Sequence, residues 1–75
     1  MTRRLDEILN EINKDILEND NLIEKGIISS IDVIAIVSEI EVELGVEIAP
    51  EDIKTANFTS YETIKKLFSK YEKRS

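Results

Sequence analysis

Apolar residues recur every three or four positions in three stretches of the chain, which is the spacing of a helix with one buried face. The first stretch predicts a helix from Thr2 to Glu18, ended by the polar run Asn19-Asp20-Asn21. The last stretch predicts a helix opened by a capping box of Thr59 and Glu62. Its buried face is expected to consist of Ile64, Leu67, Phe68 and Tyr71.

The segments between these helices contain more apolar residues than a free linker would. Leu22 to Ile28 is expected to fold back over the core. Val46 to Ala49 should be extended because the following proline disfavours helix, and Pro50 to Ile53 should form one short helical turn. The pattern therefore predicts an all-α fold, a small bundle of three long helices and one short helix, in a single domain over residues 1–75.

The middle helix is expected to begin at Ser29 or Ser30 and to end at Leu44, where Gly45 supplies a stop. Ser29 and Asp32 have the spacing of a capping box, with aspartate in place of the usual glutamate or glutamine. This pair should therefore stabilise the N-terminus of the middle helix.

The apolar residues of the middle helix fall on two faces, although a surface helix needs only one. The face expected in the core contains Val33, Ile36, Val37, Ile40 and Leu44. The opposite stripe contains Ile31, Ile34, Ala35 and Val42 around Ser38, with Asp32, Glu39 and Glu43 on one border and Glu41 on the other.

Two interpretations of this second stripe compete. The segment Leu22 to Ile28, or a second copy of the chain, could cover it. Alternatively, it is an exposed apolar patch rimmed by carboxylates, which is typical of a protein docking surface. We favour the docking surface.

The composition limits the chemistry that the chain can perform. It has no cysteine and no histidine, so disulfides, thiolate metal sites and the most common general base are absent. Calcium binding through Asn19-Asp20-Asn21 and Glu24 is disfavoured because alternating ligands and a central glycine are missing. We therefore expect neither an enzyme nor a metal site.

The charge is unevenly distributed. The chain has 10 basic and 16 acidic residues, a net charge of -6, and no lysine or arginine between Gly26 and Ile53. This acidic centre disfavours nucleic acid and attracts basic protein surfaces. No apolar run approaches the roughly 20 residues of a membrane span. We expect a monomeric cytoplasmic protein.

Two adjacent serines, Ser29 and Ser30, stand at the start of the middle helix. A hydroxyl there lies beside unpaired amide protons and the positive end of the helix dipole. Such a position suits a covalently attached phosphate, and Ser30 is the candidate attachment residue.

The chain resembles the acyl carrier protein family over almost its whole length. The family opens its second helix with Asp-Ser-Leu/Ile/Met, and Ser29-Ser30-Ile31 occupies that place here. The segments Glu41–Ile48 and Pro50–Asp52 match in register. The resemblance implies that Ser30 carries 4'-phosphopantetheine from coenzyme A, added by a phosphopantetheinyl transferase. It also implies partner enzymes that load and transfer acyl or aminoacyl groups and that have basic surfaces.

One departure concerns the residue before the modified serine, which is aspartate in the family and Ser29 here. Serine caps a helix as well as aspartate. The resemblance implies that the carboxylate helps the transferase to recognise its substrate, so we expect its absence here to weaken recognition by a standard transferase. Ser29 could itself be the attachment residue, although the register with Ile31 favours Ser30. Ala35, Gly45 and the segment Asn57–Ser60 look more like D-alanyl and peptidyl carriers than fatty-acid carriers.

The alternative function is an unmodified helical interaction module with an acidic docking face. In both cases the expected partner-binding residues surround the second apolar stripe. They are Ser29, Ile31, Asp32, Ile34, Ala35, Ser38, Glu39, Glu41 and Val42.

Overall fold

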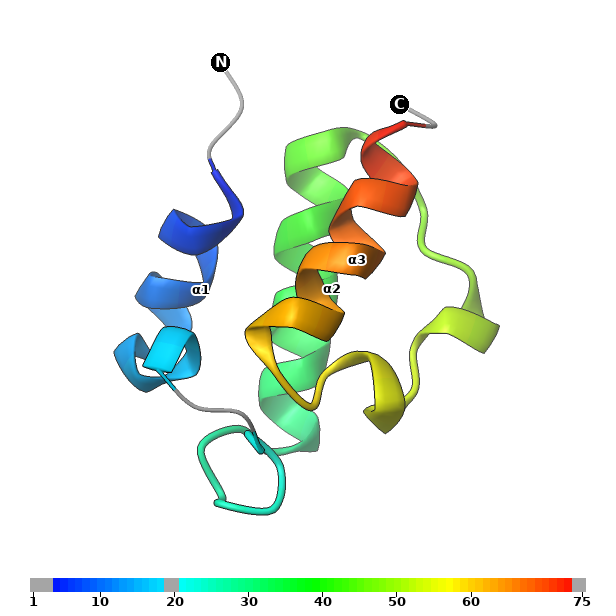
Figure 1. Ribbon diagram of the computed structural model, residues 1–75. Helices are drawn as coiled ribbons and strands as arrows, with labels where there is room; N and C mark the ends of the chain where they lie inside the picture. The colour runs from blue at the N-terminus through cyan, green and yellow to red at the C-terminus, as the bar shows by residue number, and fades with distance from the viewer. Residues whose placement is uncertain (1–3, 19–20, 74–75) are drawn as a thin grey trace.

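The computed structural model describes residues 4–18 and 21–73, which form three α-helices and three 3-10 turns. The helices are α1 (Leu5–Ile12), α2 (Ser30–Leu44) and α3 (Tyr61–Glu72). The turns are η1 (Lys14–Glu18), η2 (Pro50–Asp52) and η3 (Thr55–Asn57). Figure 1 shows α3 crossing in front of α2, with α1 beside them. The all-helical prediction is confirmed, but the expected short fourth helix is only the 3-10 turn η2.

The first helix is shorter than predicted because Asn13 interrupts it. The Asn13 side-chain amide donates to the Ile27 carbonyl at 3.0 Å, and its side-chain oxygen accepts the Asp15 amide proton at 2.9 Å. These bonds hold Asn13 in an extended conformation, so the chain continues as η1, which still buries Ile16. The predicted limit at Thr2 and the run at 19–20 lie outside the described residues.

The last helix begins one residue later than predicted. Ser60, not Thr59, is the N-cap, and its hydroxyl accepts the Thr63 amide proton while the Thr63 hydroxyl oxygen accepts the Ser60 amide proton. The Thr59 carbonyl instead accepts the Leu22 amide proton at 2.8 Å. This bond ties the segment before α3 to the segment before α2.

The core lies where the three helices and both long connections meet. The segment 22–28 packs into it as predicted, with Leu22 and Ile28 buried and Ile23 and Ile27 partly buried. Gly45 ends α2 as predicted, in a left-handed conformation (φ +65°) with its amide donating to the Glu41 carbonyl. The buried residues contributed by α2 and α3 are Val33, Ile36, Val37, Ile40, Ile64, Leu67, Phe68 and Tyr71.

Candidate functional site

The start of α2 holds the two adjacent serines in different roles. Ser29 is the N-cap residue, and the Asp32 carboxylate accepts its amide proton at 2.9 Å and its hydroxyl proton at 3.3 Å. The predicted capping box is thus confirmed. Ser30 is the first helical residue and is exposed. Both serines are exposed, but the side chain of Ser29 is engaged at the helix start, and Ser30 follows it as the first residue of the helix.

The backbone before Ser30 is fixed by the core. The Leu22 carbonyl accepts the amide protons of Ile27 at 2.8 Å and Ile28 at 3.2 Å. Ile28 is buried, and Gly26 closes the turn with a positive φ of 69°. A group attached to Ser30 would therefore stand on an anchored loop, next to amide protons of a helix N-terminus that favour a negative charge.

The outer stripe of α2 is open in the described structure. The exposed fractions of Ile31, Ile34 and Val42 are 76%, 64% and 81%. Ser38 is exposed and Ala35 is partly buried. Because the segment 22–28 packs into the core, the interpretation that it covers this stripe is wrong. Large apolar side chains on a small domain are consequently left in water, in a row that starts beside Ser30.

The carboxylates along this stripe differ in their local roles. Asp32 caps the helix, as described above. The Glu41 carboxylate accepts the Ile48 amide proton at 2.9 Å and so fastens the segment after Gly45 to α2. The sequence placed Glu41 on the border of the stripe and among the partner-binding residues, but it did not predict this bond, because a bond between residues seven positions apart depends on the loop conformation.

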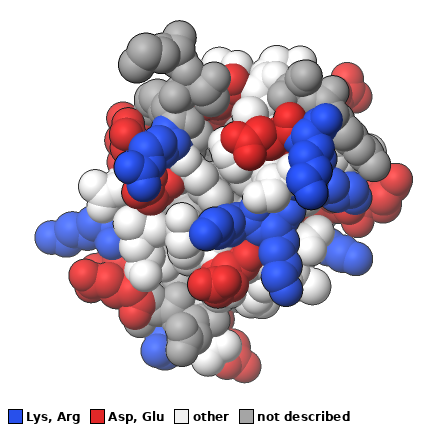
Figure 2. All heavy atoms as spheres, turned by 45° about the horizontal axis from the view of Figure 1, so that its top comes forward, with Lys and Arg blue, Asp and Glu red and all other residues white. Residues whose placement is uncertain are grey.

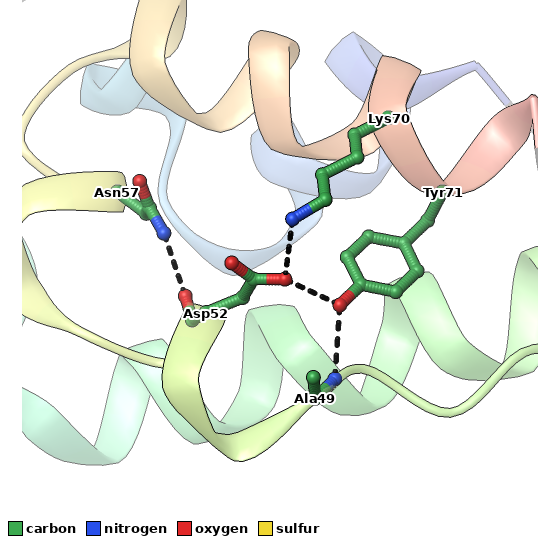
Figure 3. A network of polar contacts seen from close by, with 5 residues as sticks. All are labelled: Ala49, Asp52, Asn57, Lys70 and Tyr71. Atoms are coloured by element: carbon green, nitrogen blue, oxygen red, sulfur yellow. Dashed lines mark hydrogen bonds and ion pairs between the residues drawn. The ribbon is translucent and has the colours of Figure 1, made fainter.

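A polar network fastens the neighbouring segment to α3 (Figure 3). The Tyr71 hydroxyl accepts the Ala49 amide proton at 3.0 Å and donates to the Asp52 carboxylate. Lys70 Nζ lies 2.9 Å from the same carboxylate oxygen, and the Asn57 side chain donates to the Asp52 carbonyl at 2.7 Å. The Ile48 amide is thus bonded to a side chain of α2, and the next amide, that of Ala49, is bonded to a side chain of α3.

The network also changes the acidity of Asp52. The hydrogen bond from Tyr71 and then that from Lys70 hold the pKa of the Asp52 carboxyl below its ordinary value, because both favour the charged form. From the sequence, Tyr71 was expected only in the core and Asp52 only within the segment Pro50–Asp52, and neither was expected to contact the other or Lys70. Nothing in the spacing of these residues signals that they meet.

A comparison with protein families decides the assignment. The model of the family described as "Phosphopantetheine attachment site" matches residues 2–68. The chain belongs to this family. It is a carrier domain, not an enzyme, and the family carries 4'-phosphopantetheine covalently. Neither the curated proteins nor the solved structures that were searched gave a match.

Membership places the site in a functional context. A carrier domain of this family interacts with a phosphopantetheinyl transferase and with biosynthetic enzymes. None of the helices formed by the described residues is long and apolar enough to cross a membrane. The exposed serine at the start of α2 has the chemistry that the prosthetic group requires, a hydroxyl that can form a phosphate ester.

Proposed function

We propose that Ser30 is the attachment residue and that the chain carries acyl or aminoacyl groups between enzymes. The observation that supports this assignment most directly is the division of roles at the helix start. Both serines are exposed, but Ser29 is the N-cap and its hydroxyl is bonded to Asp32, whereas Ser30 is the first residue of α2.

The bound group supplies a thiol whose thioester holds the cargo. The chain contributes position and chemical inertness. Because the sequence lacks histidine and cysteine, neither the most common general base nor a competing thiol can lie near the cargo. The thioester would therefore persist until a partner enzyme acts on it.

The proposed docking surface is the outer stripe of α2 with its acidic rim. The apolar side chains of Ile31, Ile34 and Val42 would be buried against the partner, and carboxylates would pair with basic residues of the partner. Charge pairing raises the rate of encounter and stays reversible, as a carrier that visits several enzymes requires. The complete proposed surface consists of Ser29, Ile31, Asp32, Ile34, Ala35, Ser38, Glu39, Glu41 and Val42.

Intact mass tests the attachment residue. After incubation with coenzyme A and a broad-specificity transferase, the wild-type chain and Ser29→Ala should each gain one phosphopantetheine group. Ser30→Ala should gain none. Modification that persists in Ser30→Ala would contradict the assignment. No gain in the wild-type chain, with a known carrier modified in the same assay, would favour the unmodified interaction module.

A second variant tests the missing aspartate of the family. Ser29→Asp should leave the free energy of unfolding nearly unchanged, because serine and aspartate are comparable N-caps. It should accelerate modification by a standard transferase if a charge at this position guides recognition. Equal rates for the two proteins would show that Ser29 is neutral in recognition.

The cargo class and the cellular setting are part of the proposal. We propose a monomeric, cytoplasmic carrier closer to D-alanyl and peptidyl carriers than to fatty-acid carriers. Ala35 supports this choice, because a small, partly buried residue stands where fatty-acid carriers usually bear a glutamate. Loading assays with an aminoacyl-activating enzyme and with a fatty acyl transferase would distinguish the two classes.

A further inference from the structure

The outer face of α3 is basic, although the chain as a whole is acidic. An open hollow on this face is lined by Glu62, Lys65, Lys66, Ser69, Lys70 and Lys73. Figure 2, in which the C-terminal end of α3 is turned forward, shows blue lysine and arginine side chains gathered near the centre of the view. We call this surface, defined by the six lining residues, the basic hollow.

Two of its lysines already make contacts within the chain. Lys70 Nζ lies 2.9 Å from the Asp52 carboxylate and 5.6 Å from the centre of the Tyr71 ring. Lys65 Nζ lies 6.0 Å from the centre of the Tyr61 ring. A ligand that binds lysines already restricted by such contacts loses less side-chain entropy than one that must order free side chains.

The basic hollow is separate from the proposed docking surface. That surface lies on α2, inside the stretch from Gly26 to Ile53 that has no lysine or arginine. A partner with a basic surface would be attracted to α2 and repelled by the basic hollow. The two helices therefore favour partners of opposite charge.

We propose that the basic hollow binds a short acidic segment, rich in aspartate and glutamate, of a second protein. Lys65 and Lys73 are eight residues apart, which is about 12 Å along a helix. A few carboxylates of a peptide can span this distance and pair with the lysines.

A short acidic peptide fits this surface better than nucleic acid or an anionic membrane. Glu62 belongs to the lining of the hollow, and the whole chain has a net charge of -6. An extended polyanion would bring phosphates close to the acidic residues around the hollow as well as to the lysines. A short peptide can contact the lysines alone. An acidic segment could thus hold the carrier by α3 while enzymes visit α2 in turn.

Binding of a fluorescent oligo-glutamate peptide at low ionic strength tests this proposal by anisotropy. The triple variant Lys65→Glu/Lys66→Glu/Lys73→Glu should bind about tenfold or more weakly than the wild-type chain. Lys70 is left unchanged because it holds Asp52. The matched control, Arg4→Glu/Lys14→Glu/Lys25→Glu, has the same net charge and changes none of the residues that line the hollow or act on Asp52. It should keep most of the affinity, and circular dichroism should confirm that both variants are folded.

Several outcomes would overturn the proposal. Equal losses in the two triple variants would show that only the net charge matters. Absence of peptide binding to the wild-type chain would also overturn it, as would binding only to phosphatidylserine vesicles or to DNA. The measurement is repeated on Ser30→Ala, which cannot be modified at the proposed position. Its result is therefore independent of whether the proposed attachment residue is correct.

Discussion

Helices α2 and α3 meet the core in the same way but differ on their outer faces. Each buries four side chains that are at most 8% exposed. Outside the core, α2 presents large apolar residues, with Ile31 76% and Val42 81% exposed. The outer face of α3 instead presents lysines, such as Lys66 and Lys73.

This difference separates the demands of folding from those of function. A charged outer face is what a surface helix needs for solubility, and α3 satisfies that need. Exposed isoleucine and valine side chains do not stabilise the folded chain, because they stay in water on folding. The outer face of α2 is therefore the part of the fold that stability alone does not explain. Substitutions in the core, in the polar network and on the outer face of α2 should therefore differ in their effects on stability.

The largest effect is expected at the core face. Ile40 is fully buried in α2, so Ile40→Ala should lower the free energy of unfolding by about 2–5 kcal/mol, through lost apolar burial and a cavity. Ile64→Ala on α3 should fall in the same range, because Ile64 is also fully buried. Urea denaturation measures both. Losses below about 1 kcal/mol would show that these positions can relax, and that the shared core is less important than we argue.

The hydrogen bonds between Tyr71 of α3 and the connection from α2 to α3 should contribute to stability. Tyr71→Phe keeps the buried ring but removes the hydroxyl that joins Ala49 and Asp52. Leaving the part-buried Ala49 amide without its acceptor should cost about 1–3 kcal/mol. Hydrogen exchange at the Ala49 amide should accelerate more than exchange in the middle of α2. Lys70→Met is the matched control, because it removes a half-exposed charge and keeps the tyrosine bonds, and its effect should be smaller.

The charge of Asp52 should make the stability of the folded chain depend on pH, with an effect smaller than that of Tyr71→Phe. Its pKa is lower in the folded chain than the ordinary 3.8, so its contribution to stability is fully present above the unfolded pKa. The contribution is lost as the pH falls through 3.8 toward the lower folded pKa. Asp52→Asn should therefore be less stable than the wild-type chain at neutral pH. The difference should narrow in acid, and parallel stability curves for the two proteins would contradict this.

Local signals predicted much of this fold. Helical periodicity identified α2 and the buried face of α3, because each pattern is long and agrees with a cap or a glycine stop. The same reasoning overextended the first helix. Asn13 has the backbone of Ile27 as a partner, and a contact between residues 14 positions apart leaves no periodic signal. The start of α3 shifted by one residue for a similar reason, since Thr59 is bonded to Leu22.

In the candidate site, too, local features were predicted and contacts between distant residues were not. The capping box of Ser29 and Asp32 lies within four residues, so spacing alone predicted it correctly. The bond from Ile48 to Glu41 and the Asp52 network join segments that meet only after folding. Sequence patterns therefore located the serine and the outer stripe of α2, but not the contacts that hold the loop beside them.

The smallest effect on stability, and the most informative one on function, is expected at Ile34. Because its side chain is 64% exposed, Ile34→Ala should change the free energy of unfolding by no more than about 0.5 kcal/mol. If the outer stripe is the docking surface, the same variant should be modified more slowly by the transferase at every salt concentration, because apolar contacts are not screened. Glu39→Gln should slow modification mainly at low salt, where charge steering is strongest. The control is Lys66→Ala on the outer face of α3, which should leave the rate of modification nearly unchanged. If Ile34→Ala destabilises the domain as much as Ile40→Ala, the two faces of α2 are both part of the core, and the docking surface must be sought elsewhere.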